Sequence, residues 1–265
     1  MTQPIWKDSP AEDQIYPFSS REDCLTLLQR APEFMLDIGC GAGGVAHWIK
    51  QRHPKCKGWG CEINPSAGKL AEKYYERVIV GNIEEIDIST LAPSRPFDLV
   101  CLFDVLEHFN HPWRFLERLR QLTSIDAQII VSLPNASNLL LLYDAYRGYW
   151  RYRKNGLLDV THLRFFTDFD ARKMFYQTGY RVVSTRCNQF GEAGDIFERH
   201  KGDNFPSTLS LGDFSVTVRS TDDLSRLCAQ QNIYLLEPAD AASLTPAEIE
   251  MASGHYPPTH AFGFE

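Results

Sequence analysis

The chain has 265 residues, enough for one α/β domain of ordinary size with additions; 43% of the residues are hydrophobic and 23% are charged. Its formal net charge of −7 argues against nucleic acid and acidic membranes as general partners. No apolar run is long enough to cross a bilayer, the first residues lack the features of a signal peptide, and the seven cysteines form no C-x-x-C pair, so we expect a cytoplasmic protein without a metal site.

The first regular element that the sequence predicts is a helix over residues 21–30. Ser19 and Ser20 precede it as capping residues, its first turn is acidic, and Arg30 ends it. This order of charges complements the helix dipole. We expect the helix to pack just ahead of the first strand.

A glycine-rich turn follows the apolar segment 34–38, which predicts a short buried strand. Gly39, Gly41 and Gly44 satisfy G-x-G-x-x-G, and a helix is expected from Val45 onward. Glycines let the backbone turn tightly and approach a ligand. The spacing alone also fits a dinucleotide site, in which a pyrophosphate lies at the helix N-terminus.

Asp37 distinguishes between these ligands, because it lies at the end of the strand and faces the bound molecule. Its charge disfavours a pyrophosphate and favours a cationic amino-acid group. The run Asp37-Ile38-Gly39-Cys40-Gly41-Ala42-Gly43 resembles the cofactor motif of class I S-adenosylmethionine (SAM)-dependent methyltransferases. The resemblance implies SAM as the cofactor, held by Asp37, Gly39, Cys40 and Gly41, and an N-terminal segment that covers it.

Two later strand ends supply further candidates for cofactor binding. Glu62 ends a predicted strand over 57–62, about 25 residues beyond Asp37, close to the spacing at which an acid meets ribose hydroxyls. We assign the neighbouring Ile63 to the same site. A third strand over 77–80 leads to Asn82 and Ile83, which we expect at the adenine.

The segment 97–103 is a near-continuous apolar run typical of a central parallel strand. It delivers Asp104-Val105-Leu106-Glu107-His108 to the sheet edge where ligands of α/β folds bind. We assign Phe103 and Asp104 to the cofactor. A helix over 112–123 and a buried strand over 127–133 follow.

The remaining chain predicts a cap insertion over about 138–166, rich in aromatic and cationic residues, in which we expect substrate specificity to lie. A helix over 168–178, a strand over 180–185, a loop over 188–213, a final antiparallel strand over 214–219 and helices over 221–230 and 246–252 complete the prediction. The expected fold is α/β, a Rossmann-like seven-stranded, mostly parallel sheet. Residues 1–190 form the SAM-binding core with the N-terminal helix and the cap; residues 191–265 complete the sheet and add an extension.

Three motifs resemble a bacterial subgroup close to the ubiquinone-biosynthesis O-methyltransferases: residues 104–108, 132–135 and 157–167. Members often accompany glycosyltransferases, so the resemblance implies a small-molecule or glycan acceptor. The oligomeric state stays open.

A hydroxyl acceptor must lose its proton as it attacks the methyl group, which calls for a general base. His162 and His108 flank the predicted site, and histidine titrates in the right range. We favour His162 as the base, with Asp159 orienting an imidazole or binding a sugar hydroxyl.

Other interpretations of the same residues remain. Asp104, Glu107, His108 and His162 resemble the metal ligands of small-RNA 2′-O-methyltransferases, although the first acidic position there is glutamate; a metal would lower the pKa of a sugar hydroxyl. An NAD-dependent oxidoreductase fits the glycine spacing, but Asp37 disfavours it. A non-catalytic SAM-binding regulatory protein fits the glycine turn and Glu62.

Overall fold

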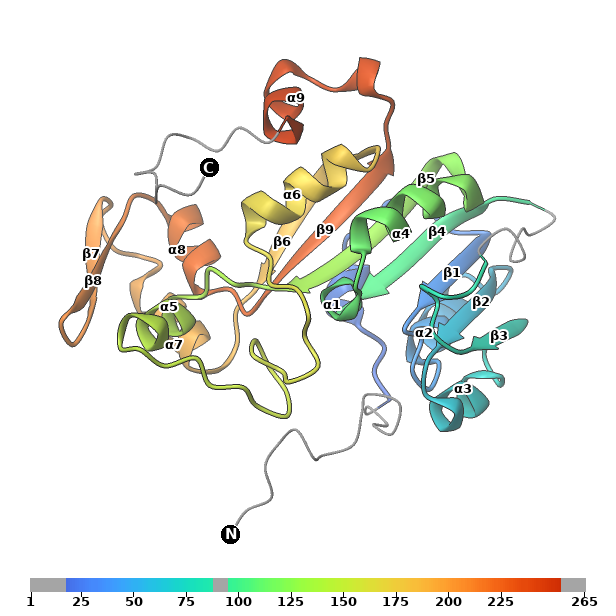
Figure 1. The fold of residues 1–265 in the computed structure, drawn as a ribbon, viewed down its shortest axis with the longest axis horizontal. Helices are drawn as coiled ribbons and strands as arrows, with labels where there is room; N and C mark the ends of the chain where they lie inside the picture. Colours follow the sequence, from blue (N-terminus) through green and yellow to red (C-terminus); the bar gives the residue numbers. More distant parts are fainter. Residues whose placement is uncertain (1–17, 88–94, 254–265) are drawn as a thin grey trace, which may run out of the picture.

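The computed structural model describes residues 18–87 and 95–253 and is built on a seven-stranded sheet (Figure 1). The strand order is β3-β2-β1-β4-β5-β9-β6, and only β9 runs antiparallel to its neighbours. The strands are β1 (Phe34–Ile38), β2 (Lys57–Glu62), β3 (Arg77–Val80), β4 (Phe97–Phe103), β5 (Thr123–Pro134), β6 (Tyr180–Asn188) and β9 (Gln231–Pro238). The expected mostly parallel sheet is confirmed.

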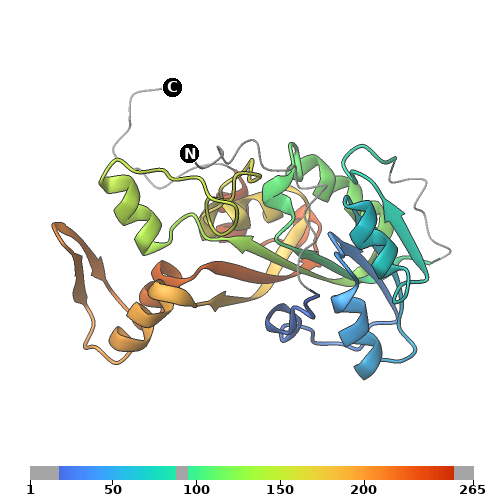
Figure 2. The same ribbon diagram turned by 90° about the horizontal axis from the view of Figure 1, so that it is seen from below.

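Helices cover both faces of the sheet. The helices of the described residues are α1 (Glu22–Leu25), α2 (Gly44–Arg52), α3 (Pro65–Ala71), α4 (Pro112–Leu119), α5 (Leu139–Tyr146), α6 (Asp168–Gln177), α7 (Gly191–His200), α8 (Thr221–Cys228) and α9 (Pro246–Ala252). Phe115 of α4 and Phe175 of α6 share one core, whereas Leu25 of α1 and Ile49 of α2 belong to the core of the other face (Figure 2). Within the described ranges, no helix is both long and apolar enough to cross a membrane.

A third, smaller core lies beside the sheet, at the left of Figure 1. It joins the cap helix α5 to α7, to α8 and to a hairpin of β7 (Ser207–Leu211) and β8 (Phe214–Val218). Its buried members include Leu139, Ile196, Leu209 and Leu224. The segment after residue 190 therefore packs against the cap and then returns to the sheet as β9.

The predicted final strand over 214–219 was assigned to the wrong partner, because β8 pairs only with β7. The strand that completes the sheet is β9, inserted between β5 and β6. Its centre, Ile233 to Leu236, is a continuous apolar run that is fully buried, as an interior strand requires. β8 alternates exposed residues with half-buried ones and ends at the buried Val218, a pattern that suits a two-stranded ribbon with one face on the third core.

The predicted helix over 21–30 is also too long, because α1 ends at Leu25. Gln29 and Arg30 instead donate their backbone N–H groups to the side-chain oxygen of Gln128, at 2.8 and 2.9 Å. These tertiary hydrogen bonds replace the helical ones. No side chain caps α1, and the predicted loop over 188–213 contains α7 and β7. Residues 1–17, 88–94 and 254–265, which the predicted division into a core and an extension includes, lie outside the described residues.

Phe97 anchors the larger core, and its truncation to alanine is expected to cost about 3–5 kcal/mol of the free energy of unfolding. The ring is fully buried, stacks on Phe34 at 4.6 Å between centroids and meets Trp59 edge-on at 5.5 Å. Denaturant unfolding of Phe97→Ala measures the loss. Ile125→Ala is the control, because that side chain is 84% exposed and its removal should change stability by less than about 0.5 kcal/mol.

Candidate active site

A cavity of about 740 Å³ opens at the carboxyl ends of β1, β2 and β4. Open α/β sheets bind their ligands at this edge. All of the predicted site residues line the cavity: Asp37, Gly39, Cys40, Gly41, Glu62, Ile63, Asn82, Ile83, Phe103, Asp104, His108, Asp159 and His162. Residues spread over 126 positions of the sequence therefore meet at one site, and the roles assigned to them remain predictions.

The lining of this cavity is strongly acidic. Its charged members are the guanidinium of Arg21 and six carboxyl side chains, those of Asp37, Glu62, Glu84, Asp104, Glu107 and Asp159. Such a lining attracts a ligand with positive charges, such as the ammonium and sulfonium of SAM. It opposes the pyrophosphate of a dinucleotide.

The glycine turn brings two backbone segments together beside the cavity. Gly39, in the left-handed region at φ 71°, donates its N–H to the carbonyl of Cys61 at 2.8 Å. A Cβ on Gly44 would lie 2.0 Å from the carbonyl oxygen of Ser19, so only glycine allows the N-terminal segment this close. Ser19 and Arg21 consequently line the cavity, where the resemblance placed a covering segment.

Asp37 is 1% exposed and accepts a hydrogen bond from the hydroxyl of Tyr75. Burial raises the pKa of Asp37 to about 7, and the charge of Glu62 adds to the effect, while the Tyr75 hydroxyl and the Arg21 guanidinium oppose it. The site thus holds a carboxyl group that a bound cation would help to ionise.

Glu62 and Asn82 lie on the loops that follow β2 and β3. One carboxylate oxygen of Glu62 accepts the N–H of Gly41 at 2.8 Å and the other that of Asn64 at 2.9 Å. Asn82 uses its side chain within its own turn, accepting from the N–H of Glu84 and donating to the Glu85 carboxylate. Glu62 therefore ties the glycine turn to the end of β2.

Asp104 follows β4 with φ 54° and lies in a dense polar network. Its carboxylate accepts hydrogen bonds from Arg21 at 2.8 Å, from the Ser132 hydroxyl at 2.8 Å and from the Gln231 amide at 2.6 Å. The sequence interpretation missed Arg21 and Gln231. The apolar run that begins after Asn232 indicates a buried strand, and Gln231 lies at the start of that strand. Nothing in the sequence marks Arg21.

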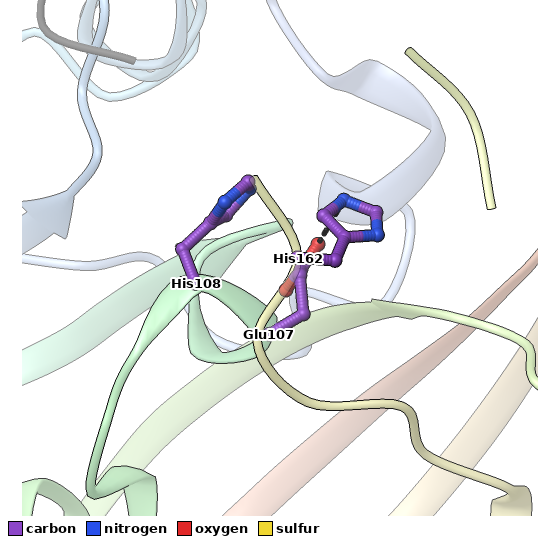
Figure 3. A group of neighbouring side chains, drawn as sticks. All are labelled: Glu107, His108 and His162. Carbon is purple, nitrogen blue, oxygen red and sulfur yellow. Dashed lines mark ion pairs between the residues drawn. The ribbon is translucent and has the colours of Figure 1, made fainter. Parts of the chain in front are cut away.

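The two candidate bases converge from the short turn Leu106–His108 and from the loop before α6 (Figure 3). Their ring centroids lie 4.9 Å apart. His162 Nε2 is 4.0 Å from a carboxylate oxygen of Glu107, a residue that is 1% exposed. Asp159 contacts neither ring; one of its oxygens accepts from the N–H and hydroxyl of Thr161. It acts on His108 through the Thr161 hydroxyl, 3.2 Å from His108 Nδ1.

Both imidazoles present the same tautomer. His162 Nδ1 donates to the carbonyl of Leu157 at 3.1 Å, and His108 Nδ1 donates to the carbonyl of Thr161 at 3.2 Å. The lone pair of each ring is then on Nε2. Burial lowers the pKa of both histidines, and the neighbouring His162 lowers that of His108 further, so the rings stay neutral.

Comparison with known proteins establishes the family. Residues 17–185, more than half of the chain, match the model described as "Methyltransferase domain". The chain belongs to this family. It is a class I SAM-dependent methyltransferase by fold and by family, and the match overrules the oxidoreductase alternative.

Individual relatives of this methyltransferase are distant. A trans-aconitate 2-methyltransferase from Methylobacterium nodulans is 30% identical over 40% of this chain and 40% of its own length. An ajmaline N-methyltransferase from Rauvolfia serpentina is 28% identical over 39% and 36%. The first curated relatives are matched over only 28–40% of their length.

Solved structures agree on the fold of the methyltransferase. A protein from Thermotoga maritima, described as a possible histamine N-methyltransferase, aligns with a TM-score of 0.54 at 14% identity, covering 84% of this chain and 90% of that one. A methyltransferase from Archaeoglobus fulgidus gives 0.51 at 18% identity, covering 78% and 86%. At these identities the likeness shows the fold alone.

Proposed function

We propose that the methyltransferase transfers the methyl group of SAM to a hydroxyl of a small molecule or of a sugar or glycan precursor, with His162 as the general base. The observation that carries the proposal is the neutral His162 ring on the wall of the acidic cavity, with its lone pair on Nε2. A neutral imidazole in this position is able to take a proton.

The need for a base favours oxygen over nitrogen as the acceptor atom. A hydroxyl is a poor nucleophile until it loses its proton, whereas a neutral amine attacks first and loses its proton afterwards. Methyl transfer itself is an in-line displacement that depends on holding the acceptor oxygen against the methyl carbon. A cavity of about 740 Å³ is large enough to hold cofactor and acceptor together.

The acceptor class rests on the resemblance to the ubiquinone-type subgroup and its glycosyltransferase neighbours. The cap, which contributes Asn155, Gly156 and Leu157 to the cavity wall, is the segment that would select the acceptor. The relatives include a trans-aconitate 2-methyltransferase and an ajmaline N-methyltransferase, so an assay must compare acceptor types.

The test begins with calorimetric titration of the protein with S-adenosylhomocysteine, followed by methyl transfer from labelled SAM to a panel of sugar, phenol, acid and amine acceptors. We expect transfer to hydroxyl acceptors. His162→Ala should lower turnover by about 10²–10⁴-fold, the usual share of a general base, and leave cofactor affinity within about twofold.

The matched control is His111→Ala, since His111 is exposed and does not line the cavity. This variant should retain full turnover. Transfer to amines alone, or undiminished turnover in His162→Ala, would contradict the proposal. Cofactor binding without transfer to any acceptor would favour the non-catalytic alternative.

A further inference from the structure

Glu107 is a buried carboxyl group that lacks a hydrogen-bond partner in the described part of the chain. It is 1% exposed, and neither side-chain oxygen has a hydrogen bond among the described residues. An unsatisfied buried carboxyl costs free energy, so this arrangement calls for a positively charged group that the protein itself does not supply.

Two histidines lie beside Glu107, and each has a ring nitrogen with a lone pair near its carboxyl group. Glu107, His108 and His162 each offer an atom able to bind a metal ion, and these atoms lie within 4.8 Å of one another. Because both Nδ1 atoms already donate to backbone carbonyls, the set contains acceptors and no donor (Figure 3). Metal-binding histidines characteristically donate their second ring nitrogen in this way.

The backbone holds the three residues in register. The carbonyl of Glu107 accepts the N–H groups of Leu163 and Arg164, at 2.8 and 3.0 Å, which ties the loop of His162 to the turn of Glu107 and His108. Asp159 and Thr161 brace His108 from the side away from its lone pair. Such outer contacts orient metal ligands before the ion arrives.

We infer that Glu107, His108 and His162 bind one divalent transition-metal ion, with open coordination positions toward the cofactor cavity. Imidazole ligands suit Zn²⁺, Co²⁺ or Fe²⁺ better than Mg²⁺ or Ca²⁺. Bond lengths of 2.0–2.2 Å place two ligand atoms of a tetrahedral ion about 3.4 Å apart, so His162 Nε2 and the Glu107 oxygen, 4.0 Å apart, would approach each other by about half an ångström when the ion binds. Three protein ligands with an open position are typical of catalytic sites.

Asp104 is not a fourth ligand, contrary to the set that the sequence suggested. Its carboxylate oxygens are occupied by Arg21, Ser132 and Gln231. The inferred ion therefore has fewer protein ligands and more open positions than the four-residue set would leave.

The consequence for catalysis rests on the proposed function. When held by Glu107, His108 and His162, such an ion would lower the pKa of a nearby acceptor hydroxyl, so that the hydroxyl would lose its proton to water more readily before its oxygen attacks the methyl carbon and the carbon–sulfur bond breaks. The products are the methyl ether and S-adenosylhomocysteine, with the proton already in solvent. His162 would act as a ligand in the metal-loaded protein and as the general base of the proposed function in the metal-free protein.

The test is metal binding by the whole chain, independent of turnover. After treatment with EDTA and its removal, the protein is titrated with Co²⁺, followed by visible absorption, and with Zn²⁺, followed by calorimetry. We expect one ion per chain, and at least a tenfold loss of affinity in each of Glu107→Gln, His108→Ala and His162→Ala. His111→Ala is the control that should bind as the wild type does.

Titration with S-adenosylhomocysteine runs in parallel and confirms that each variant is folded. Glu107→Gln keeps the shape of the side chain, so it stays informative if an alanine variant fails to fold. Wild-type protein that binds S-adenosylhomocysteine but neither ion overturns the metal site and leaves the proposed function standing. Equal metal affinity in all three variants likewise overturns it, while failure to bind S-adenosylhomocysteine would count against the proposed function instead.

Discussion

Asp37→Asn is expected to stabilise the empty protein at pH 8 by up to about 4 kcal/mol. The pKa of Asp37 is about 7 in the folded chain, against a usual value of 3.8. Each pKa unit corresponds to about 1.4 kcal/mol. Because the folded state holds the proton more tightly, the stability from the protonated Asp37 is present below about pH 4 and is lost as the pH rises through 7. Asparagine stays neutral and avoids this loss.

The same substitution should weaken SAM binding by about 10- to 100-fold, the loss of one charged hydrogen bond. In the wild type, affinity for SAM should fall as the pH drops below 7, by at most tenfold per unit, because the cation must then displace a proton from Asp37. Asp37→Asn should remove this dependence.

Urea unfolding at pH 5 and pH 8, and SAM titration over the same range, measure both effects. The exposed Asp213→Asn serves as the matched control and should change neither. A variant that binds SAM as tightly as the wild type would refute the role of Asp37. A gain in stability that does not grow between pH 5 and pH 8 would refute the buried, protonated carboxyl.

Part of this site could be predicted from local patterns in the sequence. Asp37, Glu62 and Asp104 each end a strand, and a strand end next to a glycine turn or a loop is a local pattern. In a parallel sheet the carboxyl ends meet at one edge, so local patterns alone place these residues in one cavity. The burial of Asp37, the left-handed backbone of Asp104 and the like charges of all three mark them as residues kept for a ligand rather than for stability.

Residues supplied by distant segments could not be predicted in the same way. Arg21 reaches Asp104 from a left-handed backbone conformation at φ 48°. A sequence indicates this conformation only where glycine occupies the position. Gln231 depends on β9, a strand that follows a helix and inserts between β5 and β6. The chain after α1 leaves the predicted helical path because Gln29 and Arg30 donate their N–H groups to the side chain of Gln128, about 100 residues away. These features arise from tertiary contacts that override local propensity.

Glu107 shows a second limit of prediction from the sequence. The sequence placed it beside His108 at the right edge of the sheet, but its two unpartnered oxygens become visible only when burial is known. His108 and His162 are 54 positions apart, and their meeting depends on the carbonyl of Glu107, which binds the second loop. The candidate ligands could therefore be predicted from the sequence, but the meeting of the three side chains at one place could not.

Glu62→Ala is expected to lower the affinity for S-adenosylhomocysteine by about 100-fold or more. Each oxygen of the Glu62 carboxylate already accepts one backbone N–H, from Gly41 or from Asn64. A carboxylate oxygen has a second lone pair, so each oxygen is still able to accept a ribose hydroxyl. Two hydrogen bonds to a charged group, at about 1.5–3 kcal/mol each, account for a loss of this size.

Calorimetry on three variants separates ribose binding from support of the glycine turn. Glu62→Gln retains one acceptor oxygen and should bind with intermediate affinity, whereas Glu72→Ala, which removes an exposed carboxylate paired with Lys69 beyond α3, should bind as the wild type does. If Glu62 only supported the turn, adenosine and S-adenosylhomocysteine would lose affinity together with a lowered thermal midpoint of the empty protein. If it holds the ribose, 2′,3′-dideoxyadenosine should bind the wild type and Glu62→Ala almost equally, because this nucleoside lacks both hydroxyls that the Glu62 carboxylate would accept.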